Sequence, residues 1–171
     1  SLPDKNFYIS RNEPAAQLAE DFTYWKNGGA VSTVIVAEKG NGKTTFFEIA
    51  EKEIIKEHKI IKTELKGTIC KETELFEVLK NAFETNGAYT IEDIEKEILL
   101  NDTRRIFYLE NFQNIYLRKM DGFEAVERFL LFMERTQQKI FFIVSCNVYA
   151  WNFIDLATSA ARYFQRVIQI K

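Results

Sequence analysis

Residues 30–45 read AVSTVIVAEKGNGKTT, and this stretch decides the fold. Its first half, residues 30–37, is a continuous run of β-branched and apolar residues that is too short for a typical helix. Because the run does not alternate with charged residues, we expect a strand that is buried on both faces. Such strands belong to parallel sheets covered by helices on both sides. The second half changes to glycine, lysine and threonine, which predicts a tight turn that opens a helix.

The turn between this strand and its helix carries a phosphate-binding pattern. Residues 37–44, AEKGNGKT, match the P-loop pattern G-x-x-x-x-G-K-[ST] except at the first position, where Ala37 replaces glycine. An alanine there costs on the order of 1 to 2 kcal/mol if the position requires a positive φ angle, although a small residue can be enough. The competing interpretation is an ordinary strand-to-helix turn that carries a lysine and glycines by coincidence.

Each residue type in the turn has an expected role at a nucleotide phosphate. Gly40 and Gly42 can take backbone angles closed to other residues and bring successive N–H groups close to phosphate oxygens. The helix that follows adds unpaired N–H donors and the positive end of its dipole. Lys43 is expected to reach the β- and γ-phosphates, and Thr44 to offer its hydroxyl to Mg²⁺. The expected phosphate-binding residues are Gly40, Asn41, Gly42, Lys43, Thr44 and Thr45.

A second strand end supplies an acid. Residues 104–111, RRIFYLEN, are a run of bulky apolar residues that leads to Glu110, as in a Walker B strand. A parallel strand beside the first would deliver Glu110 to the Mg²⁺ side of the phosphate site. Asn111 stands where a second acid often follows. Either Glu110 serves Mg²⁺ and hydrolysis is weak, or Glu110 acts as the base and Mg²⁺ depends on Thr44. The competing interpretation is a solvated glutamate at a strand end.

A further strand, residues 139–145, leads into Ser145-Cys146-Asn147. A polar side chain just past a strand beside the P-loop can hydrogen-bond the γ-phosphate or the attacking water, which is a positioning role. Asn147 is the first candidate for this positioning role, and Ser145 is the second. The expected catalytic residues are therefore Lys43, Glu110 and Asn147. An ordinary turn asparagine is the alternative.

The remaining sequence alternates between helical and strand patterns. This alternation implies right-handed crossovers and a three-layer α/β fold around a parallel sheet. We find no internal repeat or interdomain linker, so residues 1–171 are expected to form a single domain. Helices are expected at residues 14–26, 44–57, 72–84, 91–100 and 123–136, with short helices after residue 145. Strands are expected at residues 30–37, 58–65, 105–110, 139–145 and 166–170.

The composition suits one globular domain and disfavours several classes of protein. The 171 residues are 46% hydrophobic and carry a net charge of −2, so the chain can bury a core. It lacks the basic excess that favours non-specific binding to nucleic acid or anionic membranes. No stretch reaches the roughly 20 apolar residues that span a bilayer. Cys70 and Cys146 lie in or beside apolar runs, which favours core thiols over a disulfide or metal pair, and a reducing, cytoplasmic location.

Together the motifs resemble those of AAA+ and related STAND-type P-loop ATPases. The resemblance covers nearly the whole chain. It implies a five-stranded parallel sheet of order 5-1-4-3-2, ATP and Mg²⁺ as cofactors, Glu110 in the Walker B position and Asn147 in the sensor position. The helical lid subdomain of that family is expected after the fifth strand, so the chain resembles the excised core of a larger protein. The motifs are AEKGNGKTT at 37–45, RRIFYLEN at 104–111, FFIVSCN at 141–147 and YFQRVIQIK at 163–171.

The resemblance also implies partners. Members of this family often complete the active site with an arginine from a neighbouring subunit, so a homo-oligomer is expected, with Arg162 or Arg166 as the contributed residue. The alternative for each is a surface arginine paired with an acid. An effector domain or protein, which the sequence does not identify, would receive the nucleotide signal. N-terminal segments of the family often flank the adenine, which points to Tyr8 or Arg11.

The expected function is therefore an ATP-binding P-loop ATPase domain that uses Mg-ATP binding and slow hydrolysis to switch or drive a larger assembly. Ala37 and Asn111 leave a second function open, a nucleotide-binding or scaffold module without turnover. A third is a kinase-like transfer to a small acceptor, which the acidic and sensor motifs suit less well than transfer to water.

Overall fold

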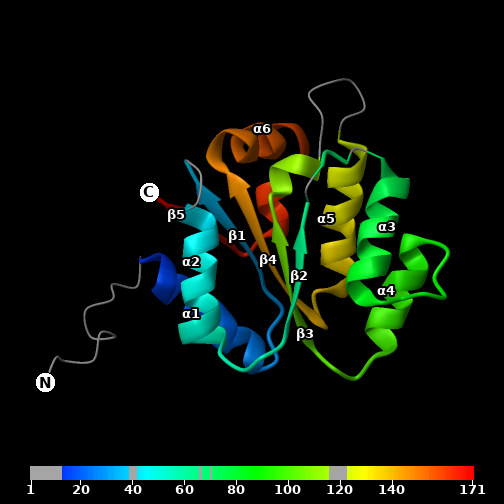
Figure 1. The fold of residues 1–171 in the computed structure, drawn as a ribbon, viewed down its shortest axis with the longest axis horizontal. Helices are drawn as coiled ribbons and strands as arrows, with labels where there is room; N and C mark the ends of the chain where they lie inside the picture. Colours follow the sequence, from blue (N-terminus) through cyan, green and yellow to red (C-terminus); the bar gives the residue numbers. More distant parts are fainter. Residues whose placement is uncertain (1–12, 39–41, 66, 70, 116–122) are drawn as a thin grey trace, which may run out of the picture.

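A single parallel sheet of five strands forms the centre of the molecule (Figure 1). The computed structural model describes residues 13–38, 42–65, 67–69, 71–115 and 123–171. The strand order is β2-β3-β4-β1-β5, which is the expected order 5-1-4-3-2 read from the other edge. The strands are β1 (Ser32–Ala37), β2 (Ile60–Glu64), β3 (Arg105–Glu110), β4 (Ile140–Asn147) and β5 (Arg166–Ile170).

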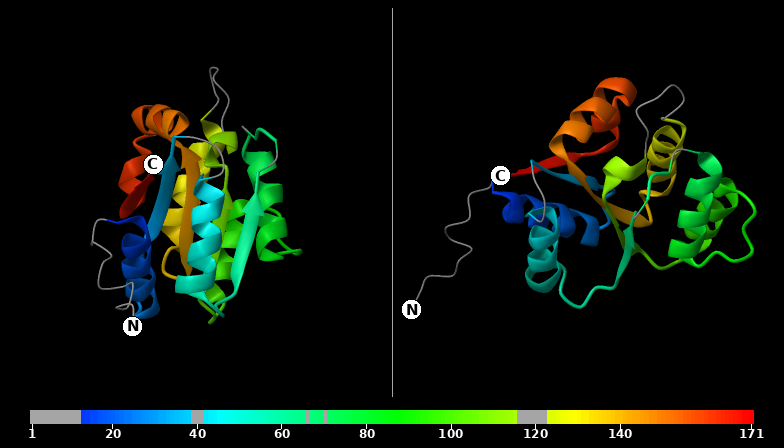
Figure 2. Two further views of the ribbon diagram at one scale, coloured as in Figure 1. Left: turned by 60° about the vertical axis from the view of Figure 1, so that its left-hand side comes forward. Right: turned by 45° about the horizontal axis from the view of Figure 1, so that its top comes forward.

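Helices cover both faces of the sheet and complete three layers (Figures 1 and 2). Helices α1 and α2 pack on one face, and α3, α4, α5 and α6 contribute to the core on the other. The three-layer α/β fold expected from the sequence is confirmed. The helices are α1 (Pro14–Lys26), α2 (Gly42–Ala50), α3 (Glu72–Phe83), α4 (Ile91–Leu100), α5 (Glu124–Thr136) and α6 (Val148–Thr158).

Two hydrophobic clusters, one on each face of the sheet, form the core. Because side chains alternate along a strand, Val34 of β1 joins the cluster of α3 to α6, and Ile35 joins the cluster of α1 and α2. All six residues of β1 are buried, as predicted for a strand covered on both sides. In the second cluster the ring of Tyr108 lies parallel to that of Phe47, with centroids 3.6 Å apart. This contact ties β3 to α2, the helix that follows the P-loop.

Several elements differ from the sequence-based predictions; β4, for example, continues through Asn147 and does not end at residue 145. The helix expected at residues 44–57 is divided: α2 ends at Ala50, and a π-helical turn, η2 (Glu51–Ile55), continues it. Lys56 then takes a positive φ of 57°, which turns the chain toward β2. After β4 a regular eleven-residue helix, α6, forms in place of several short ones, and a 3-10 turn, η4 (Ala160–Tyr163), follows it.

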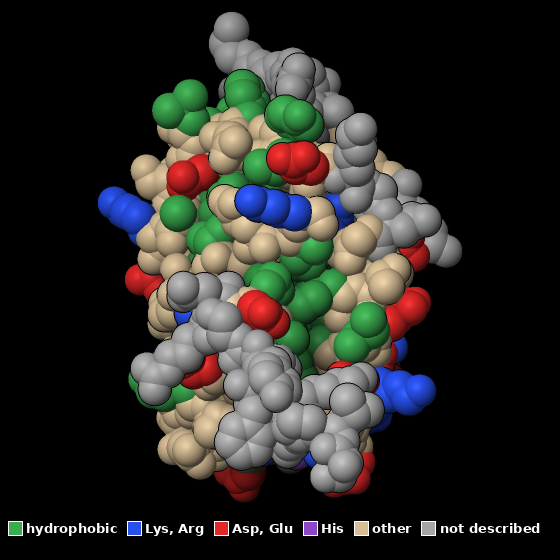
Figure 3. Space-filling model, turned by 90° about the vertical axis from the view of Figure 1, so that its left-hand side faces the viewer, with side chains coloured by type: hydrophobic (Ala, Val, Ile, Leu, Met, Phe, Trp, Pro, Cys, Tyr) green, Lys and Arg blue, Asp and Glu red, His purple; other side chains and the backbone are tan. Residues whose placement is uncertain are grey.

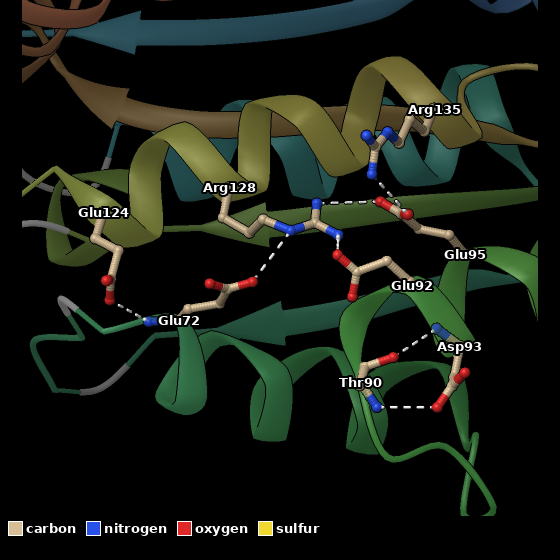
Figure 4. A network of polar contacts seen from close by, with 8 residues as sticks. All are labelled: Glu72, Thr90, Glu92, Asp93, Glu95, Glu124, Arg128 and Arg135. Atoms are coloured by element: carbon tan, nitrogen blue, oxygen red, sulfur yellow. Dashed lines mark hydrogen bonds and ion pairs between the residues drawn. The ribbon is translucent and has the colours of Figure 1, made fainter.

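A buried arginine joins the three helices α3, α4 and α5 (Figure 4). The side chain of Arg128 is 9% exposed and forms ion pairs with Glu72 at 3.3 Å, Glu92 at 3.2 Å and Glu95 at 3.1 Å. Glu95 is also buried, and its other oxygen pairs with Arg135 at 3.3 Å. The network therefore contains a largely desolvated pair, Arg128 and Glu95, whose charges depend on each other.

The outer side of α6 exposes apolar residues. Tyr149, Phe153 and Leu156 are the large exposed hydrophobic side chains of this helix. Figure 3 shows hydrophobic side chains gathered at the top of the molecule, the end at which α6 lies in Figure 1. Even so, across the described part of the chain we find no helix with the length and apolarity needed to cross a membrane.

Candidate nucleotide site

The carboxyl edge of the sheet brings together the strand ends that the sequence singled out. Strand β1 lies between β4 and β5, and Ala37 at its end is level with Asn147 of β4 and Ile170 of β5. Strand β3 lies on the other side of β4 and ends at Glu110. Helix α2 begins at Gly42, beyond the end of β1. The end of β1, the start of α2, Glu110 and Asn147 therefore share one edge, where open α/β sheets bind ligands.

Thr44 and Glu110 contact each other directly. The hydroxyl Oγ1 of Thr44, in the first turn of α2, donates a hydrogen bond of 2.5 Å to Oε1 of Glu110 at the end of β3. The predicted Walker A hydroxyl and the predicted Walker B acid are thus adjacent. A hydroxyl and a carboxylate oxygen together are ligands that Mg²⁺ accepts, usually with several waters retained.

Lys43 is buried at the same helix start. It is 5% exposed, and within the described residues it forms no ion pair with an acid. The buried thiol of Cys146 lies near enough to respond to its charge: burial raises the pKa of Cys146 to about 12, and Lys43 opposes that rise. Cys146 is a free core cysteine, as expected, and Cys70 lies outside the described residues. A buried lysine without a carboxylate partner suits a site that receives an anion.

Asn147 is both the last residue of β4, level with Ala37, and the cap of a helix. Its side-chain oxygen Oδ1 accepts a hydrogen bond of 2.8 Å from the backbone N–H of Ala150, so it is the N-cap of α6. The backbone N–H of Asn147 donates to Oε1 of Gln113 at 3.3 Å. The capping bond fulfils the alternative interpretation of Asn147 as a turn residue, yet it uses only the amide oxygen. Its Nδ2 group makes no hydrogen bond within the described chain and can serve as a donor.

Asn111 has a conformational reason to be an asparagine. Its φ is 68°, in the left-handed region where asparagine is tolerated far better than most residues. Its backbone N–H donates to Oγ of Ser145 at 3.2 Å. Ser145 is fully buried beneath the site, so the expectation of Ser145 as a second positioning residue is wrong: its hydroxyl supports the turn after β3.

Gln113 is the residue of this edge that sequence reasoning missed. It lies in the short 3-10 turn η3 (Phe112–Ile115), and its Nε2 donates to Oδ1 of Asn111 at 3.2 Å. Its Oε1 accepts from the backbone N–H of Asn147 at 3.3 Å. One side chain thereby links the ends of β3 and β4. The only sequence signal was its position three residues after Glu110, which no motif marked.

Two residues of the P-loop, Ala37 and Gly42, have ordinary backbone angles. Ala37 has no positive φ, so an alanine there carries no left-handed penalty. Gly42 does not use the backbone angles that glycine alone permits, because it is the first residue of α2 and its φ is not positive. A Cβ on Gly42 would meet only Ile170, at 3.9 Å. Gly40 and Asn41 lie outside the described residues, and Thr45 is exposed on α2.

The two candidate arginines are placed differently. Arg166, at the start of β5, pairs within its own chain with Asp21 at 3.1 Å and Glu20 at 3.3 Å. Residue Arg166 is level with Thr33 near the start of β1, at the edge opposite the P-loop. Arg166 therefore matches the alternative interpretation from the sequence, an arginine paired with acids of its own chain and not one contributed to a neighbouring subunit. Arg162 lies in η4 and lines a small polar hollow with Glu134 and Tyr163. Tyr8 and Arg11, proposed near the adenine, lie outside the described residues.

Comparisons with known proteins identify the fold but no close relative. No family model matches the sequence, and no curated protein matches it. Cdc6p from Pyrobaculum aerophilum is similar in structure, with a TM-score of 0.62 and 11% identity, over 94% of this chain and 46% of that one. Orc1 of Aeropyrum pernix, in complex with DNA, has a TM-score of 0.61 and 12% identity, over 99% of this chain and 48% of that one. A chain of Drosophila ORC bound to DNA has a TM-score of 0.57 and 9% identity, over 91% of this chain and 90% of that one.

At these identities the likeness shows the fold alone. The chain has the α/β core that the resemblance to AAA+ ATPases implied, and it spans about half the length of the Cdc6p and Orc1 chains.

Proposed function

We propose that this domain binds ATP with Mg²⁺ at the carboxyl edge of the sheet, and that binding followed by slow hydrolysis switches or drives a larger assembly. The observation that carries the proposal is the hydrogen bond of 2.5 Å between Thr44 and Glu110, beside the buried Lys43 at the start of α2. A helix start attracts phosphate through its free N–H groups and its dipole. The similarity in fold to Cdc6p and Orc1 supports an AAA+-like nucleotide-binding domain.

Thr44 and Glu110 would hold Mg²⁺, which when bound adds positive charge beside the phosphate oxygens. These two residues suit Mg²⁺ because their side-chain oxygens, which come from α2 and β3, lie next to each other. Lys43 would supply a second positive charge to the β- and γ-phosphates. Backbone N–H groups of Gly40, Asn41, Gly42 and Thr45 would complete the phosphate-binding turn.

Hydrolysis would depend on Glu110 and Asn147. Glu110 would accept the proton of the attacking water, and the free Nδ2 group of Asn147 would donate to the γ-phosphate or to that water. Because Asn147 is fixed by its bonds to Ala150 and Gln113, its donor would be held in place without further ordering. One carboxylate serving both metal and water explains why we propose slow turnover.

A second candidate is a nucleotide-binding module without turnover. It is favoured by Asn111, which brings no carboxylate to the position after Glu110 and whose side chain is bound to Gln113. Phosphate release well above background, abolished by Glu110→Gln, would exclude this candidate.

Partners are part of the proposal. We propose a homo-oligomer in which Arg162 reaches the site of a neighbouring subunit, because Arg166 is already paired with Asp21 and Glu20. An effector domain or protein would respond to the bound nucleotide. DNA, which the ORC and Orc1 structures contain, is not among the partners that we propose, because a net charge of −2 does not favour binding to nucleic acid.

Isothermal titration calorimetry with ATP and Mg²⁺ tests the proposal. We expect saturable binding to the wild-type protein and a loss of at least tenfold in affinity in Lys43→Ala. Lys62→Ala is the matched control, because Lys62 is an exposed lysine of β2 paired with Glu51, and it should bind as the wild type does. Absence of binding, or equal affinity in Lys43→Ala and the wild type, would contradict the proposal.

A further inference from the structure

A cavity of about 570 Å³ opens at the edge of the sheet opposite the nucleotide site. It is lined by residues at the starts of β2 and β3 and near the ends of α1 and α3, and the two strand starts lie at the bottom of Figure 1. This volume is within the range of ligand pockets, roughly 300 to 1,000 Å³. Nothing in the proposed nucleotide function uses this edge.

Positive charge is concentrated around the cavity. Lys59, Arg104 and Arg105 line it, together with the imidazole of His58 and one carboxylate, Glu84. Within the described residues, none of the three cations is within ion-pair distance of an acid, although the charges of Glu84 and Glu97 act on Arg105 from further away. The whole chain carries a net charge of −2, so this excess of cations is local. Unpaired cations around a hollow favour an anion there.

Arg104 builds the wall of the cavity. Its guanidinium donates to the backbone oxygens of Trp25, Gly29 (2.8 Å) and Gln138 (3.1 Å). It also lies 4.7 Å from the ring centroid of Trp25. Because all these acceptors are neutral carbonyl groups, the positive charge of Arg104 remains without a counter-ion in the described chain. Burial lowers the pKa of Arg104, which reflects the cost of holding that charge away from water.

Arg105 and Trp25 leave donors unused. The Nε of Arg105 is buried and has no hydrogen-bond partner in the described part of the chain, and its guanidinium lies 5.3 Å from the ring centroid of Phe83. Trp25 is 4% exposed, and its indole Nε1 also lacks an acceptor among those residues. A buried donor without an acceptor costs roughly 1 to 3 kcal/mol, and both atoms are covered by the wall of the cavity, so they add to its positive potential.

We propose that this cavity binds a small organic anion with an apolar ring, whose carboxylate or phosphate group lies against Arg105 and Lys59. The ring would occupy the apolar part of the cavity, which Ile60, Ile61 and Ala82 line. The site is separate from the nucleotide edge, so its occupancy does not require Lys43, Thr44 or Glu110.

Nuclear magnetic resonance of the indole N–H groups tests the proposal with phenyl phosphate as the probe. In a Trp151→Phe background, Trp25 is the only tryptophan, and its signal reports on the cavity directly. We expect phenyl phosphate to shift that signal saturably, and inorganic phosphate and neutral phenol to bind at least tenfold more weakly. Lys43→Ala should bind phenyl phosphate as well as the parent, which separates this cavity from the nucleotide site.

Two variants and a control locate the anion. Arg105→Gln and the exposed Lys59→Gln should each weaken phenyl phosphate binding about tenfold, since each removes a charge-assisted hydrogen bond. Arg135→Gln removes a cation paired with Glu95 elsewhere and should leave the affinity unchanged. No saturable shift of the Trp25 signal, or full affinity in both Arg105→Gln and Lys59→Gln, would overturn the proposal. Equal affinity for inorganic phosphate would overturn the role of the ring.

Discussion

The hydroxyl of Thr44 donates a hydrogen bond of 2.5 Å to the carboxylate of Glu110, a residue 66 positions further along the chain. The contact joins the first turn of α2 to the end of β3 across the carboxyl edge of the sheet. Stacking of Phe47 on Tyr108 holds the same two elements together deeper in the core. Two motifs that are distant in the sequence thereby form one site.

Glu110→Gln should separate nucleotide binding from turnover. The amide keeps the size of the side chain and an oxygen for Thr44 but cannot accept a proton from water. We expect phosphate release to fall on the order of a hundredfold or more, while the affinity for Mg-ATP changes by only a few-fold. Thr44→Ser, which keeps the hydroxyl, is the control and should retain release. A phosphate-release assay that gives the same rate for Glu110→Gln and the wild type would refute the assignment of Glu110.

Asn111→Ala should destabilise the protein because of backbone conformation. With φ at 68°, an alanine pays a left-handed penalty of about 1 kcal/mol, and the bond to Gln113 is lost as well. Asn111→Gly should recover the conformational part, since glycine takes this region freely. Urea unfolding measures both, with Asn152→Ala on the exposed side of α6 as a neutral control. If alanine and glycine at position 111 gave equal stability, the conformational explanation would fail.

Arg128→Ala should strongly destabilise the protein, because Arg128 is the buried cation that α5 directs at α3 and α4. It leaves the buried Glu95 without its closest positive charge, and breaking such a pair costs about 3 to 5 kcal/mol. Arg135→Ala removes a cation whose side chain is 47% exposed, so its cost should stay below about 1 kcal/mol. Equilibrium denaturation compares the two directly. Losses of similar size in both variants would show that Arg128 does not act as a buried partner.

The stability of the protein should depend on the protonation of Asp21. Burial raises the pKa of Asp21 above its ordinary 3.8, although the hydrogen bond from Thr33 and the charge of Arg166 act in the opposite direction. The folded state then binds the proton more tightly than the unfolded state. Ionised Asp21 therefore lowers stability at pH values above the native pKa, and this loss disappears as the pH falls toward the unfolded value.

We accordingly expect the wild type to gain stability relative to Asp21→Asn as the pH is lowered from neutrality to about 4. The difference between the two unfolding free energies across a pH series isolates this one group, because all other titrations are common to both proteins. A difference that moved in the opposite direction would mean that Arg166, and not burial, controls the pKa of Asp21.

Much of the fold was predictable from the sequence because its strands are strongly patterned. The run at residues 30–37 indicated a strand covered on both faces, which forms over Ser32–Ala37, and α1, α4, β3 and β5 have the predicted limits. The boundary at residues 44–57 was not predictable, because a helical pattern does not reveal that the hydrogen bonding widens at Glu51–Ile55.

The site was predictable where a motif fixed the residue type, and not where the backbone did. Thr44 and Glu110, singled out by two separate motifs, contact each other, and Lys43 is buried at the same helix start, while their roles at a nucleotide stay a prediction. Asn111 was interpreted as a missing acid, whereas its positive φ accounts for it. The buried role of Ser145 and the bridging role of Gln113 depend on hydrogen bonds between strand ends, which no single stretch of sequence encodes.

A crystal structure of the protein with Mg²⁺ and a non-hydrolysable ATP analogue would locate the nucleotide. We predict that the phosphates will lie at the start of α2 with Lys43 beside them, and that Mg²⁺ will be bound by Thr44 and Glu110 in place of the hydrogen bond that now joins them. Asn147 should donate through Nδ2 to the γ-phosphate or to a water next to it. A nucleotide bound elsewhere on the molecule, or phosphates without contact to Lys43 and Thr44, would contradict the account.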